Sequence, residues 1–219
     1  CGWEEPGTDY AEAAKWFRKA AEQGIPSSEI NLGTLCENGM GVSQDFGEAA
    51  GWYRKAAERG YAEAEFRLAR LLFDGKGVPE DRDGALELLR KAADQGHAGA
   101  GRSLGELYLS GNGVTKDESE AFSRISDAAG KGDVRAEMLL GSMYLNGTST
   151  ARNDSLAAEW LRKAADEGEP AAQRILGDMY RKGQGVPRDY GMAERWYIEA
   201  AAGGDRDACC SVGDLYRRG

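Results

Sequence analysis

The pattern in this sequence that most suggests chemistry is a glycine-rich segment, Gly-x-Gly-Val, found for example at Gly75–Val78. Glycine-rich loops can cradle phosphates, but such a loop needs a β-strand before it and a helix N-terminus directly after it. Here apolar residues at helical spacing precede the segment, and the segment recurs along the chain. We therefore interpret it as a structural linker.

Other side chains give little support for catalysis or metal binding. His97 is the only histidine, so no histidine cluster and no recurring Cys/His pair can form. It follows Gly96 at the expected start of a helix, and we expect it to be solvated. Most Asp and Glu residues lie at expected helix caps or on outer helix faces, which does not indicate acid–base catalysis. We expect no enzyme, no cofactor and no metal site.

The elements that position these residues repeat with a period of 36 residues. One set of glycines shows the period along the whole chain: Gly39, Gly75, Gly111, Gly147, Gly183 and Gly219. A fixed period without insertions is typical of a stacked array of repeats. In such arrays each repeat contacts mainly its neighbours, which favours a binding scaffold over an enzyme.

Each repeat is expected to hold two helices. Apolar spacing predicts a first helix, A, over about 62–74 and a second helix, B, over about 82–95. Gly75 can take the left-handed conformation that ends helix A, and Asp81 is the expected N-cap of helix B. The equivalent caps in other repeats are Asp9, Asp45, Asp117, Asn153 and Asp189.

Small residues predict a close crossing of helices A and B. One place in helix A is glycine in five repeats: Gly33, Gly105, Gly141, Gly177 and Gly213. Glycine costs roughly 1 kcal/mol of helix propensity, so close packing must offset it. We expect a large side chain of helix B, Trp52 and its equivalents, to fill the space beside the glycine. The equivalents are Trp16, Leu88, Trp160 and Trp196.

The sequence thus predicts an all-α fold, an α-solenoid of antiparallel helix pairs with a 36-residue repeat. Residues 1–219 are expected to form one array: helix B of a partial first repeat, five complete repeats from about 25 to 204, and a final helix A. Since the chain begins and ends within a repeat, we expect it to be a segment of a longer protein.

The recurring pattern resembles the Sel-one-like repeat family. The matching residues of the last complete repeat are Ala172, Leu176, Gly177, Tyr180, Gly183, Gly185, Val186, Asp189, Ala193, Trp196, Ala200, Ala201 and Gly204. The resemblance covers essentially the whole chain, whereas the related tetratricopeptide repeat has about 34 residues and lacks the glycine-rich linker. It implies a protein-interaction scaffold or adaptor that binds a partner protein or peptide.

Two other functions stay open. The chain could bind a small ligand such as a cell-wall glycan or peptide, with Trp and Tyr as stacking platforms. A cysteine-rich branch of the family is linked to β-lactam binding, but the cysteines here do not recur regularly. A β-lactam-recognising hydrolase is therefore the remote alternative.

Candidate partner-binding residues come from analogy with tetratricopeptide stacks, in which the A helices line a concave groove. They lie off the packing positions of helix A and are Phe66, Arg70, Phe73, Arg102, Glu106, Leu109, Met138, Leu145, Arg174, Asp178, Arg181 and Lys182. Large apolar members occupy the middle of the chain, and the later ones are locally basic. We expect a partner segment with apolar anchors and an acidic end. Packing of Phe66 and Met138 against the adjacent A helix is the alternative.

Two repeats depart from the pattern. At 147–150 the linker reads Gly-Thr-Ser-Thr, and Arg124 replaces the tryptophan of helix B. These changes fit either altered curvature, a special contact or neutral drift.

Charge and cysteine usage limit the partners and the compartment. The net charge of −9 argues against nucleic acid, and no apolar run approaches the length of a membrane span. Cys36 is expected in the core, and Cys209 and Cys210 are adjacent, so a bridge between them would be strained. Cys1 is either a lipid-modified N-terminus or the edge of a longer sequence. We expect a bacterial envelope location, periplasmic or secreted, with the cytoplasm and the endoplasmic-reticulum lumen as alternatives, and the oligomeric state is open.

Overall fold

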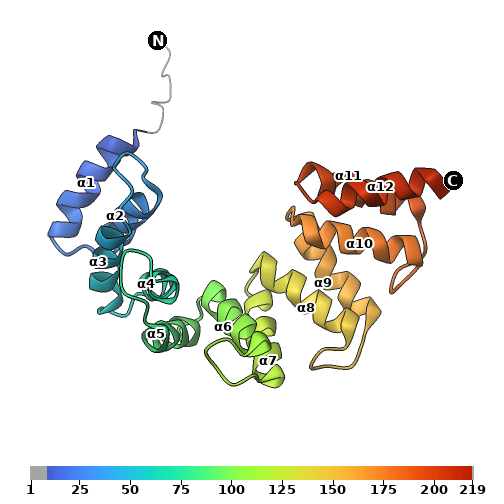
Figure 1. The fold of residues 1–219 in the computed structure, drawn as a ribbon, viewed down its shortest axis with the longest axis horizontal. Coiled ribbons are helices and arrows are strands. Elements are labelled where there is room, and N and C mark those ends of the chain that lie inside the picture. Colours follow the sequence, from blue (N-terminus) through green and yellow to red (C-terminus); the bar gives the residue numbers. More distant parts are fainter. Residues whose placement is uncertain (1–8, 219) are drawn as a thin grey trace, which may run out of the picture. The chain divides into compact units, whose positions relative to one another are not determined.

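The structure is a computed structural model that describes residues 9–218, so Cys1 and Gly219 lie outside the described residues. The described residues form twelve α-helices and no β-strand (Figure 1). The helices are α1 (Tyr10–Glu22), α2 (Pro26–Asn38), α3 (Phe46–Ala57), α4 (Ala62–Asp74), α5 (Arg82–Asp94), α6 (Ala98–Ser110), α7 (Glu118–Gly130), α8 (Val134–Asn146), α9 (Asp154–Asp166), α10 (Pro170–Lys182), α11 (Tyr190–Ala202) and α12 (Arg206–Arg218). This confirms the all-α solenoid fold class.

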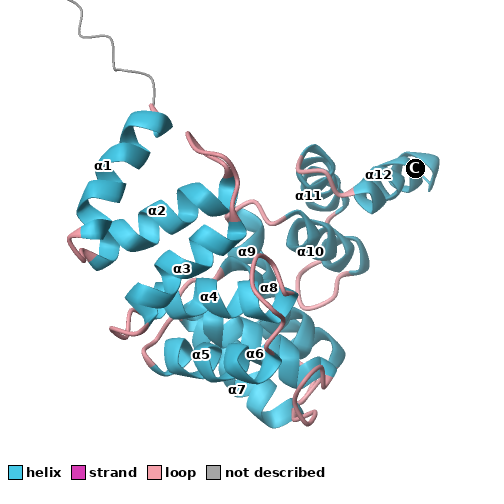
Figure 2. Ribbon diagram, turned by 60° about the vertical axis from the view of Figure 1, so that its left-hand side comes forward, coloured by secondary structure: helices cyan, strands magenta, loops and turns pink. Residues whose placement is uncertain are grey.

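The helices alternate between the two predicted types. We call α2, α4, α6, α8, α10 and α12 the A helices and the others the B helices. Within the first unit, consecutive helices from α1 to α5 pack against one another, and within the second unit those from α7 to α12 do the same. Short loops join the helices (Figure 2). Each described helix is too short and too polar to cross a lipid bilayer.

The chain divides into two compact units, residues up to Ala100 and residues from Gly101. The first unit has a core that includes Leu32, Tyr53 and Leu68. The second has a core of its own around Leu161 and Leu176. The arrangement of residues 1–219 as one array stays a prediction.

The predicted helix caps are confirmed. The Asp81 carboxylate accepts a hydrogen bond from the Gly84 N–H at the start of α5, and Gly75 ends α4 with a φ of +63°. Side chains at the other predicted cap positions accept in the same way, namely Asp9, Asp45, Asp117, Asn153 and Asp189. These caps satisfy backbone donors that a helix start would leave unpaired.

The close crossing of A on B is confirmed, but the filling residue differs from the prediction. An ideal Cβ on Gly33 would lie 2.6 Å from the Tyr53 ring, so the residue after Trp52 crosses the glycine. The equivalent residues Ile125, Leu161 and Tyr197 lie against Gly105, Gly141 and Gly177. The prediction of Trp52 was wrong because neighbouring residues of a helix point about 100° apart, and the tilt of helix B selects the second one.

The tryptophans of the B helices do not fill the space at the glycine but lie beside the contact between the glycine and the next residue. Trp52 is buried while Trp16 is 61% exposed, and in both cases a lysine of the next helical turn covers the ring, Lys55 or Lys19. The indole N–H of Trp52 donates to the carboxylate four residues earlier, that of Glu48.

Both departures from the repeat pattern preserve local geometry. The Arg124 Nε donates to Glu120 at 2.8 Å, which reproduces the bond from Trp52 to Glu48. Ser149 replaces the second linker glycine and keeps a left-handed φ of 62°, close to the 70° of Gly185. Among the described residues it is the only non-glycine with a positive φ. The fold therefore holds a serine in a conformation that suits glycine.

Candidate functional site

The structure places all twelve candidate residues on A helices. The first unit carries Phe66, Arg70 and Phe73 on α4, and α6, α8 and α10 of the second unit carry the others. None belongs to the buried core, since each is half-buried or exposed. The candidates therefore fall in both units.

Two of the candidate arginines join consecutive repeats. Arg102 lies 3.0 Å from the carboxylate of Asp133, and Arg174 lies 2.9 Å from that of Asp205. The same carboxylates accept from backbone N–H groups at the starts of α8 and α12. Each pair therefore ties one A helix to the capped start of the next, and Arg102, only 15% exposed, is chiefly a structural residue.

Phe66 occupies the position of Arg102 one repeat earlier, but it makes an aromatic contact. Its ring lies 4.6 Å from that of His97, centroid to centroid. Nδ1 of His97 accepts the Ala100 N–H at 3.1 Å, and Nε2 lies 2.8 Å from the Glu63 carboxylate. The expectation of a solvated His97 was wrong, because stacking on Phe66 leaves only 19% of the side chain exposed.

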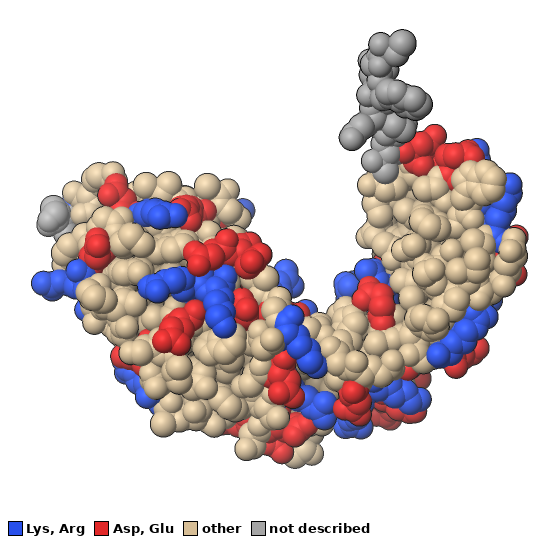
Figure 3. All heavy atoms as spheres, turned by 180° about the vertical axis from the view of Figure 1, so that it is seen from behind, with Lys and Arg blue, Asp and Glu red and all other residues tan. Residues whose placement is uncertain are grey.

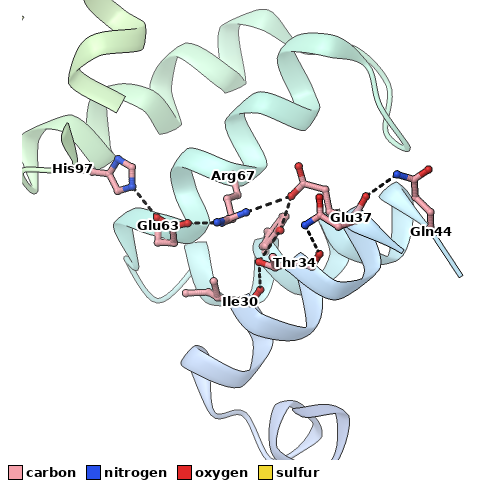
Figure 4. Close-up of polar contacts among 9 residues, drawn as sticks. Ile30, Thr34, Glu37, Gln44, Glu63, Arg67 and His97 are labelled. Carbon is pink, nitrogen blue, oxygen red and sulfur yellow. Dashed lines mark hydrogen bonds and ion pairs between the residues drawn. The ribbon is translucent and has the colours of Figure 1, made fainter. Parts of the chain in front are cut away.

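A chain of polar contacts crosses α2, α3 and α4 of the first unit (Figure 4). Arg67 pairs with Glu63 and lies 3.6 Å from Glu37, whose carboxylate accepts the Tyr53 hydroxyl at 2.7 Å. The hydrogen bond from His97, together with Arg67, lowers the pKa of Glu63 to about 2. Burial raises the pKa of Tyr53 to about 12. Both carboxylates of this network, Glu37 and Glu63, are thus already paired.

A similar cluster forms in the second unit around Tyr197. Its hydroxyl donates to Asp178 at 2.7 Å, and Arg181 bonds both the hydroxyl, at 3.1 Å, and Asp178, at 3.0 Å. Burial raises the pKa of Asp178, but the bonds from Tyr197 and Arg181 outweigh it and leave the pKa below its ordinary value. Two of the candidates, Asp178 and Arg181, therefore bond the hydroxyl of a ring that lies against Gly177.

Basic residues of the second unit are matched by acids. Acidic and basic side chains lie side by side on the face of this unit that Figure 3 shows. Arg174 and Arg181 are ion-paired, whereas Lys182 is exposed in the last turn of α10. The locally basic stretch predicted from the sequence is thus largely neutralised, because each arginine lies beside a carboxylate.

Two apolar candidates contact a core. Met138 and Leu145 are half-buried and pack against the core of the second unit. This favours the packing alternative for Met138. Leu109 is half-buried on α6, and the charged Glu106 on the same helix is exposed and pairs with Arg102 at 3.0 Å.

A row of buried acids was missed by the sequence reasoning. Glu29, Glu65 and Glu137 stand at multiples of the repeat period and are at most 7% exposed. Glu29 pairs with Arg59 at 3.1 Å, and Glu65 accepts from Gln95 at 2.7 Å. Burial raises the pKa values of Glu65 and Glu137. Their common register was the signal that could have revealed them.

A cavity of about 440 Å³ lies at the ends of α10 and α12 and the start of α11. Its lining residues are Arg181, Tyr190, Gly191, Glu194, Asp214, Leu215 and Tyr216. In earlier repeats, the linker of the following repeat covers the residue equivalent to Tyr190. Gly185, for example, packs against the backbone of Asp154. The cavity therefore corresponds to a packing position of the repeat and is not assigned to a ligand.

These features define an α-helical repeat protein built from A–B pairs with glycine-rich linkers. The family model of the Sel1 repeat matches residues 2–25, 26–61, 62–97, 102–123, 134–169 and 170–205. The chain belongs to the Sel1 repeat family, which confirms the resemblance inferred from the sequence. Sel1 repeats generally act as protein–protein interaction modules, and the family is generally non-enzymatic.

Solved structures of bacterial proteins are similar to this chain. A protective antigen of uropathogenic Escherichia coli with an SLR fold is 38% identical with a TM-score of 0.84, over 97% of this chain and 45% of the antigen. A Sel1 repeat protein from Oxalobacter formigenes is 31% identical with a TM-score of 0.81, over 96% of this chain and 89% of that protein. The chain thus spans less than half of the E. coli protein. No curated protein sequence matches it.

Proposed function

We propose that this chain is an interaction module that binds a partner protein or peptide on the exposed face of its A helices. The observation that supports this most is the half-buried state of Phe66, Phe73 and Leu109, which lie outside the buried cores. Large apolar side chains that the fold leaves partly exposed are typical anchors of protein interfaces.

The alternatives have less support. A small ligand that stacks on tryptophan needs exposed rings. Trp52 and Trp196 are buried, and Lys19 covers one face of the exposed Trp16. No contact among the described residues favours a β-lactam-recognising hydrolase over a scaffold. A location in the bacterial envelope stays part of the proposal. The similar structures come from bacteria, which fits a bacterial protein in any compartment.

The test compares two triple variants in affinity capture from native lysate. The A-helix variant is Phe73→Ala, Leu109→Ala and Lys182→Glu. It uses Lys182 rather than Arg181, because Arg181 stabilises the fold through Asp178 and Tyr197. The control carries the same kinds of change on exposed B-helix residues: Trp16→Ala, Ile198→Ala and Arg54→Glu. Circular dichroism and thermal melting establish that both variants fold.

The expected result is a partner that wild type and the control retain and the A-helix variant loses. Binding of the purified partner is then measured directly with all three proteins. A partner that the A-helix variant keeps and the control loses would place recognition on the B helices and refute the proposal.

A further inference from the structure

Three candidate residues of α4 form one stripe on the helix surface. Phe66, Arg70 and Phe73 stand at positions i, i+4 and i+7, which share a helix face. The stripe spans about 10 Å along the helix axis. Arg70 is exposed and both phenylalanines are half-buried, so a guanidinium stands between two partly exposed rings.

Arg70 differs from the other candidate arginines in its electrostatic partners. Arg102, Arg174 and Arg181 pair with carboxylates. In the described part of the chain, no ion pair joins Arg70 to a carboxylate. Its guanidinium carbon lies 5.9 Å from the centroid of the Phe66 ring. Among the four candidate arginines, the one most available to a partner is therefore Arg70, in the first unit.

Acids of α4 and α2 already have partners of their own. Asp74, four residues after Arg70 on α4, pairs with Lys76 at 2.7 Å. Glu63 bonds Arg67 and His97, and Glu37 bonds the Tyr53 hydroxyl and lies within ion-pair distance of Arg67. Since these carboxylates already have partners, they compete weakly for Arg70. An external carboxylate could pair with it without displacing an internal one.

The rings beside Arg70 are ordered before any partner binds. Phe66 stacks on His97 at 4.6 Å, and the Arg82 guanidinium covers Phe73 at 5.0 Å. Side chains that are already held lose little conformational entropy on binding. The stripe thus combines two rings that already have contacts with one exposed guanidinium.

We infer that the stripe of Phe66, Arg70 and Phe73 docks a partner segment that carries a carboxylate between two apolar side chains. The inference rests on the proposed function and names the chemistry of the partner. The carboxylate pairs with Arg70, and the flanking side chains cover the two rings. A polyphosphate ligand fits less well, because it would need several cations and the net charge of the chain is −9.

The experiment selects a displayed library of random peptides against the complete chain. The selected peptides are synthesised and their dissociation constants are measured by fluorescence anisotropy. Arg70→Glu is the test variant. Arg54→Glu is the matched control, since it makes the same charge change at an exposed arginine of the neighbouring B helix α3.

We expect the selected peptides to share an Asp or Glu flanked by apolar residues. Arg70→Glu should weaken binding on the order of tenfold or more, while Arg54→Glu should leave it unchanged. Replacing the peptide acid by Lys should restore binding to Arg70→Glu. Phe66→Ala and Phe73→Ala should each weaken binding as well.

Three outcomes would overturn the inference: no enriched motif, equal binding to Arg70→Glu and wild type, or no rescue by the charge-swapped peptide. The double variant Leu109→Ala and Lys182→Glu separates this failure from that of the proposed function. Peptides lost only in this double variant would refute the Arg70 site and keep an A-helix interaction face. Peptides that no A-helix variant weakens would refute both.

Discussion

Gly33 of α2 lies against the ring of Tyr53 of α3, and the ring fits there because glycine has no Cβ. An ideal Cβ on Gly33 would lie 2.6 Å from Cε1 of Tyr53, closer than real Cβ contacts allow. The ring is fully buried, and its hydroxyl reaches Glu37 and Thr34 beyond the glycine. The same relation joins Gly177 to Tyr197, whose hydroxyl reaches Asp178.

This relation predicts that Gly33→Ala destabilises the protein by about 1–3 kcal/mol, because an overpacked buried ring cannot move aside. Gly51→Ala is the control. An ideal Cβ on Gly51 meets nothing within 4 Å in helix α3, so the better helix propensity of alanine should stabilise by up to about 1 kcal/mol. Urea unfolding of the two variants measures both effects, and equal signs would contradict the packing account.

Ser149 gives a second prediction, in the opposite direction. Its φ of 62° lies in the left-handed region that suits glycine, and Gly185 occupies the equivalent linker position with a φ of 70°. Ser149→Gly should raise the free energy of unfolding by about 1 kcal/mol through relief of backbone strain. Gly185→Ser should lower the same quantity by at least as much, because Asp154 and Ser155 leave no room for a Cβ there. A stability loss in Ser149→Gly would show that the linker is unstrained.

The buried acid Glu137 predicts a pH effect on stability. Burial raises its pKa, and Glu167 adds to the rise, whereas the equivalent Glu29 pairs with Arg59. A folded-state pKa above the unfolded value means that the native state holds the proton longer. Stability should therefore fall as pH rises above about 4.5, the ordinary carboxyl value.

The corresponding variants are Glu137→Gln and Glu167→Arg. Glu137→Gln should stabilise by about 1 kcal/mol at pH 7 and change stability little at pH 4. Glu167→Arg should also stabilise, because it recreates the pairing of Glu29 with Arg59. Thermal melting across this pH range measures both, and a gain that does not grow with pH would contradict the assignment to Glu137.

His97 supplies the fourth prediction. Its Nδ1 accepts the Ala100 N–H at the start of α6, so Nε2 carries the proton donated to Glu63. His97→Ala removes this cap and should cost about 1 kcal/mol. His97→Asn can still accept from Ala100 and should lose less.

The Glu63 carboxyl reports the same contact by NMR titration. Its pKa of about 2 depends first on the hydrogen bond from His97, so His97→Ala should raise that pKa toward the ordinary 4.5. Because the folded-state pKa of Glu63 is depressed, its contribution to stability is complete above about pH 4.5 and is lost as pH falls toward 2. An unchanged Glu63 pKa in His97→Ala would show that Arg67 alone holds the carboxylate.

Local signals in the sequence predicted the repeat, the helices and their caps. Asp81 and Gly75 act through groups within a few residues of themselves, so their roles follow from the chain alone. The residues that match the family pattern recur with the 36-residue period, so the family could also be recognised from the sequence. The fold class was therefore accessible from the sequence.

The candidate site was only partly accessible. Phe66 and Arg102 share one register, yet the first stacks on His97 and the second pairs with Asp133. The position within the repeat placed both side chains on the surface of an A helix. It could not show which side chain is available to a partner and which one pairs with a residue of the next repeat. The sequence also did not reveal the acids that pair with Arg174 and Arg181. One partner, Asp205, lies 31 residues away in the sequence, and the other, Asp178, lies 3 residues away.

The sequence by itself determined the 36-residue period, the alternation of A and B helices and the family, since these depend on spacing and on short-range backbone preferences. Only the tertiary structure decided that Tyr53 rather than Trp52 crosses Gly33, and that Arg70 rather than Arg181 is without a carboxylate partner among the described residues. The first outcome depends on how one helix crosses another, and the second on which carboxylates the fold brings beside each arginine. Both arise from packing between side chains that can be distant in the sequence.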